Sequence, residues 1–393
     1  MGLPVLVLLG IALAAAYLFV DLPGAKAALV AVIMLGVTER VFTVLAKKSY
    51  RVKRSLDTWR VFTGVPEDNA LSVENAGRLP IHALHVIDYT DLNIAPEQSH
   101  PAIYPLEPGG KGLLRYQLYG RKRGKYKIGP TSVRYSGPLG YDGFQIEENT
   151  LHEVIVFPNL LRIANMPFKS TQPYGAIRNR WPIFEDPSII TGLRDYQQGD
   201  EIKRINWKVS AKYDKLYVNN FQPSISSGSM IALDLLEDDY QFKNRDYHVE
   251  RAVELAASLV QELFVLRQEI GFSTNCRIDR EENFLRTGVS KGEAHFTGIL
   301  TQLSIVDTAR KLLFRDIFDP ANSPLPWGTS LYVITPRLDE TALFRLIDFQ
   351  RAGHSVTVIN VGPEIRHELS LWTIGFQSFY ADFQGNLIHL MRI

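Results

Sequence analysis

The first 46 residues are patterned unlike the rest of the chain. Gly2 to Val20 carries no charged side chain and ends at the turn signal Asp21-Leu22-Pro23-Gly24. A second apolar stretch runs from Ala25 to Ala46, interrupted by Lys26 and by the pair Glu39 and Arg40. About twenty mostly apolar residues cross a hydrocarbon core of roughly 30 Å. The pattern therefore predicts a membrane helical hairpin over residues 1–46, with Glu39 and Arg40 near an interface or paired with each other.

The orientation of this hairpin follows from the charges around it. Ala12-Leu13-Ala14 resembles a signal-peptide cleavage site, but no Lys or Arg precedes the apolar run, so a retained hairpin is favoured. Residues 47–56 are predicted to be a basic juxtamembrane linker, with the cations Lys47, Lys48, Arg51, Lys53 and Arg54. The positive-inside rule then predicts a two-pass protein of the plasma (inner) membrane with the bulk of the chain in the cytoplasm.

Residues 57–166 alternate between short apolar runs and turn signals such as Glu107-Pro108-Gly109-Gly110. Without a convincing amphipathic helix, this pattern predicts an antiparallel β-sandwich. The expected strands are Thr58–Phe62, Ala70–Glu74, Ile81–Tyr89, Gly112–Leu118, Gly124–Ile128, Ser132–Tyr135 and Val154–Phe157.

The period changes in residues 229–393, where strands and helices are expected to alternate. The strands are Met230–Leu236, Gly271–Ile278, Leu331–Thr335 and Ser355–Val361, and the helices are Arg245–Gln268, Lys291–Leu303 and Asp339–Ala352. Such alternation predicts an α/β domain with a doubly wound, largely parallel sheet covered by helices on both faces. Residues 167–228, which include several prolines, are expected to be a connecting segment.

Composition narrows the functional classes. The 393 residues include 43 Lys plus Arg against 42 Asp plus Glu, a net charge of +1, which argues against nucleic acid as a partner. The single cysteine, Cys276, excludes an internal disulfide and a multi-thiolate metal site. No P-loop or zincin motif is present, so neither nucleotide hydrolysis nor zinc proteolysis is supported.

One segment of the predicted connector has a dense pattern of Gly, Asp, Trp and basic residues. Gly199 permits a tight turn, Asp200 is a good helix N-cap, and Arg194 can pair with Asp195 or Asp200. The segment resembles the signature of a bacterial and archaeal family catalogued as domain of unknown function fifty-eight. The matching positions are Gly192, Arg194, Tyr196, Gly199, Asp200, Arg204, Ile205, Trp207, Ser210, Ala211 and Lys212. The family's upstream elements resemble residues 123–130 and 137–141, with Gly137 where an Asp is usual.

The resemblance implies a membrane hairpin, a β-rich domain and a C-terminal domain similar to the von Willebrand factor type A fold. It also implies a MoxR-type AAA+ ATPase as partner, with a role in assembly or maturation of envelope proteins or metalloenzymes whose individual client is unknown. It transfers no catalytic residue, and we expect no cofactor. The expected function is a membrane-anchored scaffold or adaptor that binds protein partners and is not an enzyme.

The alternative is a metal-dependent hydrolase or adhesion-type binding module. The type A fold often holds Mg²⁺ through D-x-S-x-S, and here Asp234 is followed by Leu236 and Asp238 in place of both serines. Thr335 and Asp339 could lie near the same sheet edge. Because the ligand types are wrong for a standard site, we expect a solvated acidic loop and no metal.

Two further surfaces carry alternatives. The signature segment is either a docking surface or a packed joint between domains, and the joint is favoured because Trp207 and the isoleucines are expected to be buried. A basic run, which would be a solvated hairpin or a contact with anionic lipid, comprises Arg121, Lys122, Arg123, Lys125 and Lys127.

Overall fold

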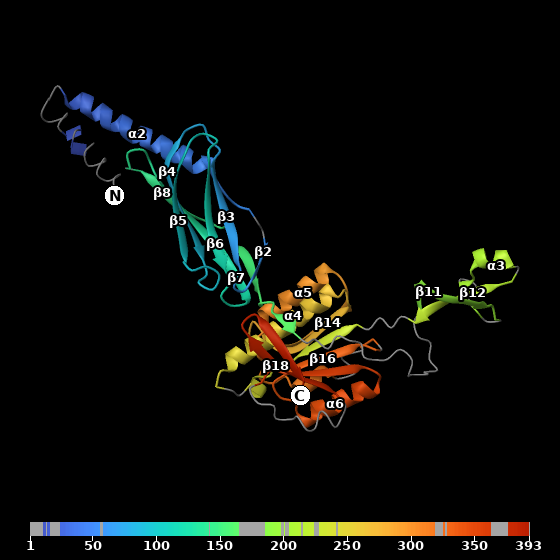
Figure 1. The fold of residues 1–393 in the computed structure, drawn as a ribbon. Coiled ribbons are helices and arrows are strands. Elements are labelled where there is room, and N and C mark those ends of the chain that lie inside the picture. The colour runs from blue at the N-terminus through green and yellow to red at the C-terminus, as the bar shows by residue number, and fades with distance from the viewer. Residues whose placement is uncertain are drawn as a thin grey trace. The chain divides into compact units, whose positions relative to one another are not determined.

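The computed structural model describes most of the chain (Figure 1). The described residues are 11–12, 14–15, 24–55, 58–140, 142–164, 185–197, 200, 204–213, 215–223, 228–240, 243–318, 325–326, 328–362 and 376–392. Contacts divide the chain into two units, which are considered separately below. Unit 1 comprises Met1–Asn159 with Leu300–Ile305, and unit 2 comprises Leu160–Ile299 with Val306–Ile393.

Unit 1 begins with one long apolar helix, α2 (Ala25–Ser49). Within the described residues, its segment Ala27–Ser49 is the one helix long and apolar enough to cross a membrane. Lys47 and Lys48 occupy its last turn, where cations interact favourably with the helix dipole. Nearly all of the first predicted span lies outside the described residues, so the structure describes one apolar helix of the predicted pair.

The segment predicted as a basic linker has regular structure. α2 continues to Ser49, and β1 (Tyr50–Arg54) then pairs antiparallel with β3 (Pro66–Asn75), which pairs with β6 (Lys111–Tyr119). Residues 47–54 are therefore helix and strand, and in β1 the exposed cations Arg51 and Lys53 alternate with Tyr50, Val52 and Arg54, which face inward.

A second sheet has the strand order β2-β9-β7-β4-β5, with β8 paired to β7. Its strands are β2 (Thr58–Phe62), β4 (Ile81–Thr90), β5 (Ser99–Leu106), β7 (Gly124–Ser136), β8 (Gly143–Glu148) and β9 (His152–Phe157). The pair β2–β9 is parallel and the other pairs are antiparallel. The runs predicted as two strands at 124–128 and 132–135 form the single strand β7.

The two sheets share one apolar core. Leu71 and Leu114 from the first sheet pack with Leu84 and Val133 from the second, and Ala46 of α2 belongs to the same cluster. The last turns of the apolar helix are therefore part of the core of the β-domain, in agreement with two sheets packed face to face.

Unit 2 contains an eight-stranded sheet with the order β10-β19-β18-β17-β16-β13-β14-β15. Its strands are β10 (Arg162–Ala164), β13 (Ser229–Leu233), β14 (Ile270–Ile278), β15 (Glu281–Ser290), β16 (Ser330–Thr335), β17 (Ser355–Asn360), β18 (Gln377–Gln384) and β19 (Leu387–Arg392). The central strands β18, β17, β16, β13 and β14 are parallel, whereas β15 pairs antiparallel with β14 and β19 pairs antiparallel with β18. The sheet is thus mixed and not parallel throughout. Residues 162–164 were expected in the sandwich, but they form β10, which pairs with β19 in the sheet of unit 2.

Helices cover this sheet on both faces. One face packs against α6 (Glu340–Arg351) and the short helix η3 (Phe314–Phe318) in a cluster that includes Ala232, Val333 and Val358. α4 (Arg245–Val265) contacts β13, β14 and β16 with its buried side, and its Phe264 stacks on Phe296 of α5 (Glu293–Ile305). All five residues of β13 are buried, as expected for a strand covered on both faces.

The predicted connector contains an ordered arm. β11 (Glu185–Asp195) and β12 (Tyr217–Pro223) form a two-stranded antiparallel sheet, and the short helix α3 (Trp207–Tyr213) lies between them in the chain. We call these three elements the signature arm.

Candidate functional site

The signature arm is held by a bidentate ion pair. Arg194 at the end of β11 donates from Nη1 and Nη2 to the two carboxylate oxygens of Asp200, at 2.7 and 2.6 Å. The backbone N–H of Gln197 donates to the same carboxylate at 2.9 Å. Chiefly because of Arg194, the pKa of Asp200 falls to about 2, so Asp200 is ionised at neutral pH. Of the two predicted partners of Arg194, the structure selects Asp200.

The helix of the arm has a different cap from the predicted one. Asn206 accepts the backbone N–H of Val209 through Oδ1 at 3.1 Å, so Asn206 caps α3, and Asp200 closes the preceding turn instead. Ile205 is buried and forms a β-bridge with Val218. Ser210 accepts the backbone N–H of Tyr217 at 2.9 Å, which ties the helix to β12.

Trp207 is exposed, and the prediction that it is buried is wrong. Its exposed fraction is 63%, and Tyr213 at the other end of α3 is 60% exposed. In this seven-residue helix Ser210 is the buried residue, against β12, whereas Trp207, Lys208 and Ala211 to Tyr213 are exposed. The side chain of Lys212 lies over the ring of Tyr213, with Nζ 5.5 Å from its centroid.

The other signature positions are placed as follows. Gly192 has open space where a side chain would begin, and Tyr196 donates its backbone N–H to Leu216 at 2.9 Å. Arg204 is half-buried. Gly199 lies outside the described residues.

A second polar cluster lies where the strand order of unit 2 reverses. β14 lies on one side of β13, and the chain then crosses to place β16 on the other side. Asp234 follows β13 and Thr335 ends β16, and Thr335 Oγ1 lies 2.8 Å from Asp234 Oδ2. Open α/β sheets bind ligands at such a switch point.

The Asp234 carboxyl is completely buried, contrary to the prediction of a solvated loop. Its Oδ1 accepts the backbone N–H of Leu236 at 3.0 Å and the amide of Asn275 at 3.3 Å. Burial, followed by the charge of Asp239, raises the pKa of Asp234 well above its ordinary value. Burial also raises the pKa of Asp239, which hydrogen-bonds to Asp234. The two carboxyls therefore form a pair that shares a proton more readily than exposed acids do.

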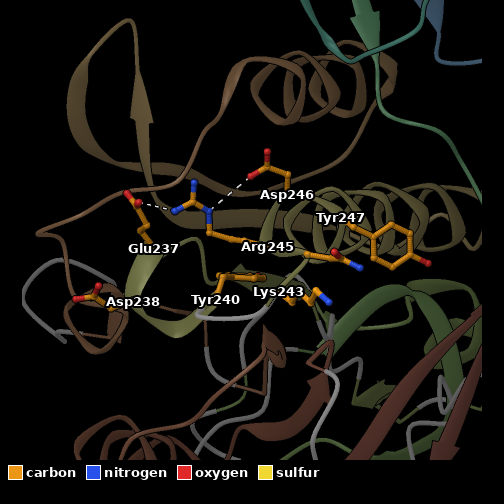
Figure 2. Close-up of a pocket in the computed structure, with 8 residues that line it drawn as sticks. Glu237, Asp238, Tyr240, Lys243, Arg245, Asp246 and Tyr247 are labelled. Carbon is orange, nitrogen blue, oxygen red and sulfur yellow. Dashed lines mark hydrogen bonds and ion pairs between the residues drawn. The ribbon is translucent and has the colours of Figure 1, made fainter.

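A pocket of about 660 Å³ lies beside this cluster (Figure 2). Glu237 lies on its wall and accepts from Arg245 Nη1 at 2.5 Å and from Arg310 Nε at 2.8 Å. These two arginines lower the pKa of Glu237, so its charge is already neutralised within the protein. The lining residues are Glu237, Asp238, Tyr240, Lys243, Asn244, Arg245, Asp246 and Tyr247.

The four candidate metal ligands do not converge. Asp234 and Thr335 meet, whereas Asp238 is exposed and Asp339 caps α6 by accepting the backbone N–H of Ala342 at 2.6 Å. Among the described residues, no three His, Cys, Asp or Glu side chains gather closely enough to hold a metal ion. Sequence reasoning overlooked Asn275, although an amide within a run of seven buried strand residues is a signal for such a cluster.

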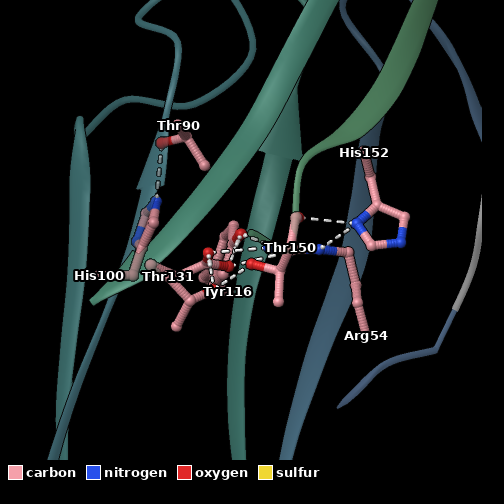
Figure 3. Close-up of polar contacts among 8 residues, drawn as sticks. Arg54, Thr90, His100, Tyr116, Thr131, Thr150 and His152 are labelled. Carbon is pink, nitrogen blue, oxygen red and sulfur yellow. Dashed lines mark hydrogen bonds and ion pairs between the residues drawn. The ribbon is translucent and has the colours of Figure 1, made fainter. Parts of the chain in front are cut away.

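A third cluster crosses the core of the β-domain (Figure 3). Arg54 of β1 binds both oxygens of Asp88 of β4 at 2.8 Å, and both side chains are completely buried. Tyr116 and Thr131 also donate to Asp88, at 2.6 and 3.0 Å. One of the five cations assigned to the membrane surface is therefore a structural ion-pair partner inside the domain.

The basic run at 121–127 lies at the start of β7, and α2 contacts the turn that follows the end of β7. Beyond Lys127 the strand continues for nine residues to Ser136, roughly 30 Å. Arg123 is buried, and Lys125 pairs with Glu153 at 2.9 Å. This placement removes the reason for expecting these residues near the membrane, since the helix enters the domain at its other end.

Comparison with known proteins finds a family match to residues 192–370, just under half of the chain. Residues 192–370 match the model of the family described as "Protein of unknown function DUF58", which confirms the resemblance predicted from the signature segment. "Uncharacterized protein YeaD" of Bacillus subtilis (strain 168) is 25% identical over 252 residues. That alignment covers 63% of this chain and 58% of the relative, so less than two thirds of the relative is matched.

Solved structures add no functional argument. The CARDB domain of a Pyrococcus furiosus protein is 18% identical with a TM-score of 0.20, covering 28% of this chain and 90% of that one. A beta-glucosidase from Listeria innocua is 12% identical with a TM-score of 0.17, covering 27% of this chain and 16% of that one. Scores this low establish neither a shared fold nor a shared function.

Proposed function

We propose, from the DUF58 match over residues 192–370 and from the exposed signature arm, that this protein is a membrane-anchored adaptor. Its N-terminal apolar segments hold it in the plasma membrane as a two-pass hairpin, with the remaining chain in the cytoplasm. The arm binds a protein partner, and the α/β unit, which we take to be of the von Willebrand factor A type, supports that binding.

The observation that carries this proposal is the exposure of aromatic side chains on the arm. Trp207 and Tyr213 are exposed at 63% and 60%, and Leu216 is exposed at 44%. Tryptophan and tyrosine are the residues most often found at the energetic centre of protein interfaces. A solvent-facing tryptophan on a short capped helix has no packing role in its own unit, so its recognition role is the better explanation.

The charge of the arm specifies the kind of partner. Residues 204 to 218 carry four basic side chains, Arg204, Lys208, Lys212 and Lys215, against one acidic side chain, Asp214. An acidic protein surface complements such a patch and speeds encounter with it. From the family resemblance, we propose that this partner is a MoxR-type AAA+ ATPase and that the complex assists assembly or maturation of other proteins.

A direct binding measurement tests the arm. The full chain in nanodiscs is titrated with a purified MoxR-type ATPase, and Trp207→Ala is compared with Phe344→Ala. Phe344 is a matched control, because it lies on α6 and is 64% exposed. Loss of a central interface tryptophan costs about 2 kcal/mol or more, so we expect binding at least roughly thirtyfold weaker for Trp207→Ala. Equal affinity of both variants would refute the role of the arm.

The membrane topology has its own test. The exposed cations Lys47 and Lys48 in the last turn of α2, and Arg51 just after it, favour a cytoplasmic body by the positive-inside rule. A fluorescent protein fused to the C-terminus should fluoresce, and a phosphatase that is active only outside the cytoplasm should stay inactive there. The opposite pair of results would overturn the cytoplasmic assignment.

A further inference from the structure

The two faces of the helix α2 differ in where, along the helix, their exposed apolar surface ends. One face stays exposed and apolar down to Val44 and Leu45, which are 39% and 41% exposed. The opposite face is buried against the β-domain from Glu39 onward, where Glu39, Thr43 and Ala46 are 2%, 3% and 5% exposed. The β-domain therefore meets α2 while the other side of the helix is still apolar.

Helix length sets where the membrane boundary falls. From Ala25 to Thr38 the helix rises only roughly 21 Å, which is short of a hydrocarbon core of roughly 30 Å. Continuing to Leu45 brings the rise to roughly 31 Å. A helix that spans the core must therefore place Glu39 about 9 Å on the membrane side of Leu45.

Glu39 is bound at this level by a turn of the β-domain, Gly137 to Asp142. The Glu39 carboxylate accepts the backbone N–H groups of Leu139 and Asp142 at 3.1 and 3.4 Å. Beside it, Arg40 Nη1 binds Asp142 at 3.0 Å. The turn thus lies level with the last apolar turns of the helix rather than below them.

The turn is built to enter a poorly hydrated layer. Gly137 N–H donates to Asp142 O and Gly140 N–H donates to Gly137 O, each at 2.9 Å, and Pro138 has no N–H group. Together with the bonds to Glu39, every described N–H group of the turn has an acceptor. Non-helical backbone is tolerated at membrane depth only when its polar groups are satisfied within the protein. The outward side of the turn is apolar, with Leu139 49% exposed.

We propose that the turn Gly137–Asp142 is a second membrane contact, in which Leu139 enters the boundary between headgroups and acyl chains of an anionic phospholipid bilayer. This inference rests on the proposed anchoring through α2. The exposed cations Lys47, Lys48 and Arg78 lie at the same end of the β-domain, because the backbone N–H of Ala76 donates to Ser49 O. Lysine and arginine there complement anionic headgroups.

Site-directed spin labelling tests this contact in the full chain. Cys276 is the only cysteine and is buried, and burial raises the pKa of its thiol to about 11, so labelling of the unmodified chain should be negligible. Leu139→Cys, Leu151→Cys and Met34→Cys are each labelled in nanodiscs of phosphatidylethanolamine and phosphatidylglycerol. Collision rates with oxygen, which partitions into lipid, and with a water-soluble nickel chelate are then compared.

Leu151 is the matched control for Leu139. It is 50% exposed in the same unit, but it lies beside Gly129, about seven residues or roughly 23 Å along β7 from the turn. We expect the label at 139 to have a higher oxygen-to-nickel collision ratio than the label at 151. In a sample of the protein without lipid or detergent, the ratio for the label at 139 should fall toward the value of the control. Met34, 64% exposed on α2, should give the highest ratio.

The outcomes separate the two proposals. If the label at 34 reports lipid while the label at 139 is as accessible to nickel as the label at 151, the membrane contact of the turn is refuted and the anchor stands. If the label at 34 is itself accessible to nickel, the anchoring proposed for the protein fails. If the label at 139 reports lipid equally in phosphatidylcholine nanodiscs, the apolar contact stands and the preference for anionic lipid is refuted.

Discussion

The buried ion pair between Arg54 and Asp88 allows a quantitative prediction for Asp88→Ala. The change removes both carboxylate acceptors of the Arg54 guanidinium and leaves that charge inside the core, with contacts to His152 Nδ1 and the Tyr116 hydroxyl, each at 3.3 Å. Tyr116 also loses its acceptor, and burial raises the pKa of Tyr116, so its hydroxyl remains protonated and unsatisfied. Removing one member of a buried pair costs about 3–5 kcal/mol.

Hydrogen exchange of the full chain in nanodiscs measures this cost locally, which avoids assigning one free energy of unfolding to a chain of two units. In the regime where exchange follows the opening equilibrium, 3–5 kcal/mol corresponds to roughly a hundredfold to a few thousandfold faster exchange of β1 and β4 amides. Amides of β13 in unit 2 should be unchanged and provide an internal reference.

Glu153→Ala is the matched control, because Lys125 and Glu153 form an ion pair of similar length, 2.9 Å, but are about half exposed. Exposed pairs contribute about 0–1 kcal/mol, so this variant should exchange at most about fivefold faster. The double variant Arg54→Met with Asp88→Leu should regain part of the loss, since it removes both buried charges. Equal effects of Asp88→Ala and Glu153→Ala would refute the argument that burial makes the Arg54 pair important.

Three further predictions follow from contacts in the two units. In Gly137→Ala, the new methyl group would overlap Glu39 Oε1 and should destabilise the turn by about 1–3 kcal/mol. The control is Gly36→Ala, because Gly36 lies on α2 with Glu39 but a methyl group there meets no other atom. Exchange rates of the 137–143 amides compare the two variants. His100 packs on Tyr116 with ring centroids 3.8 Å apart, and burial lowers the pKa of His100 in the folded protein. As the pH falls, His100 is therefore protonated in the unfolded chain before it is protonated in the folded one, and the folded state loses stability. Protection of β4 amides should fall as the pH drops below about 6.5, and His100→Phe should remove that dependence. Asp234 has a raised pKa, so ionising it costs folding energy; thermal stability of unit 2 should decline as the pH rises above about 4, and Asp234→Asn should flatten that slope, whereas an unchanged slope would contradict the burial argument.

The parts of the fold that could be predicted were helices and strands whose pattern of apolar residues is complete within one segment of the chain. The stripe of Val249, Ala252 and Val253 placed α4 correctly, and the continuous apolar run Met230–Leu236 identified a strand buried on both faces, although the strand itself ends at Leu233. β5 was not predicted because Pro101 and Pro105 argue against a strand. It is tolerated because β5 is the last strand of its sheet, where some N–H groups need no partner.

Most of the remaining errors concern contacts between residues that are far apart in the chain. Nothing in the run of cations from Lys47 to Arg54 distinguishes Arg54 from its neighbours until Asp88 is brought opposite to it by the pairing of two sheets. Trp207 was expected in the core because large apolar residues are usually buried, but the seven-residue α3 buries Ser210 and leaves Trp207 exposed. In both cases burial depends on segments far apart in the chain.

The contact between Glu39 and Gly137 links a position in the membrane helix to one in the β-domain. A side chain at position 137 would begin against the Glu39 carboxylate. Two acidic groups in a buried space disfavour each other's ionised form, so Asp at 137 is incompatible with Glu at 39 unless one is protonated. An Asp at 137 should instead accept the same turn N–H groups that Glu39 accepts here, leaving position 39 free to be apolar. We therefore expect Gly137→Asp to destabilise the turn in this chain and Glu39→Leu to restore it, as measured by exchange of the 137–143 amides, whereas independent effects of the two changes would show that the carboxylate at 39 does not hold the turn.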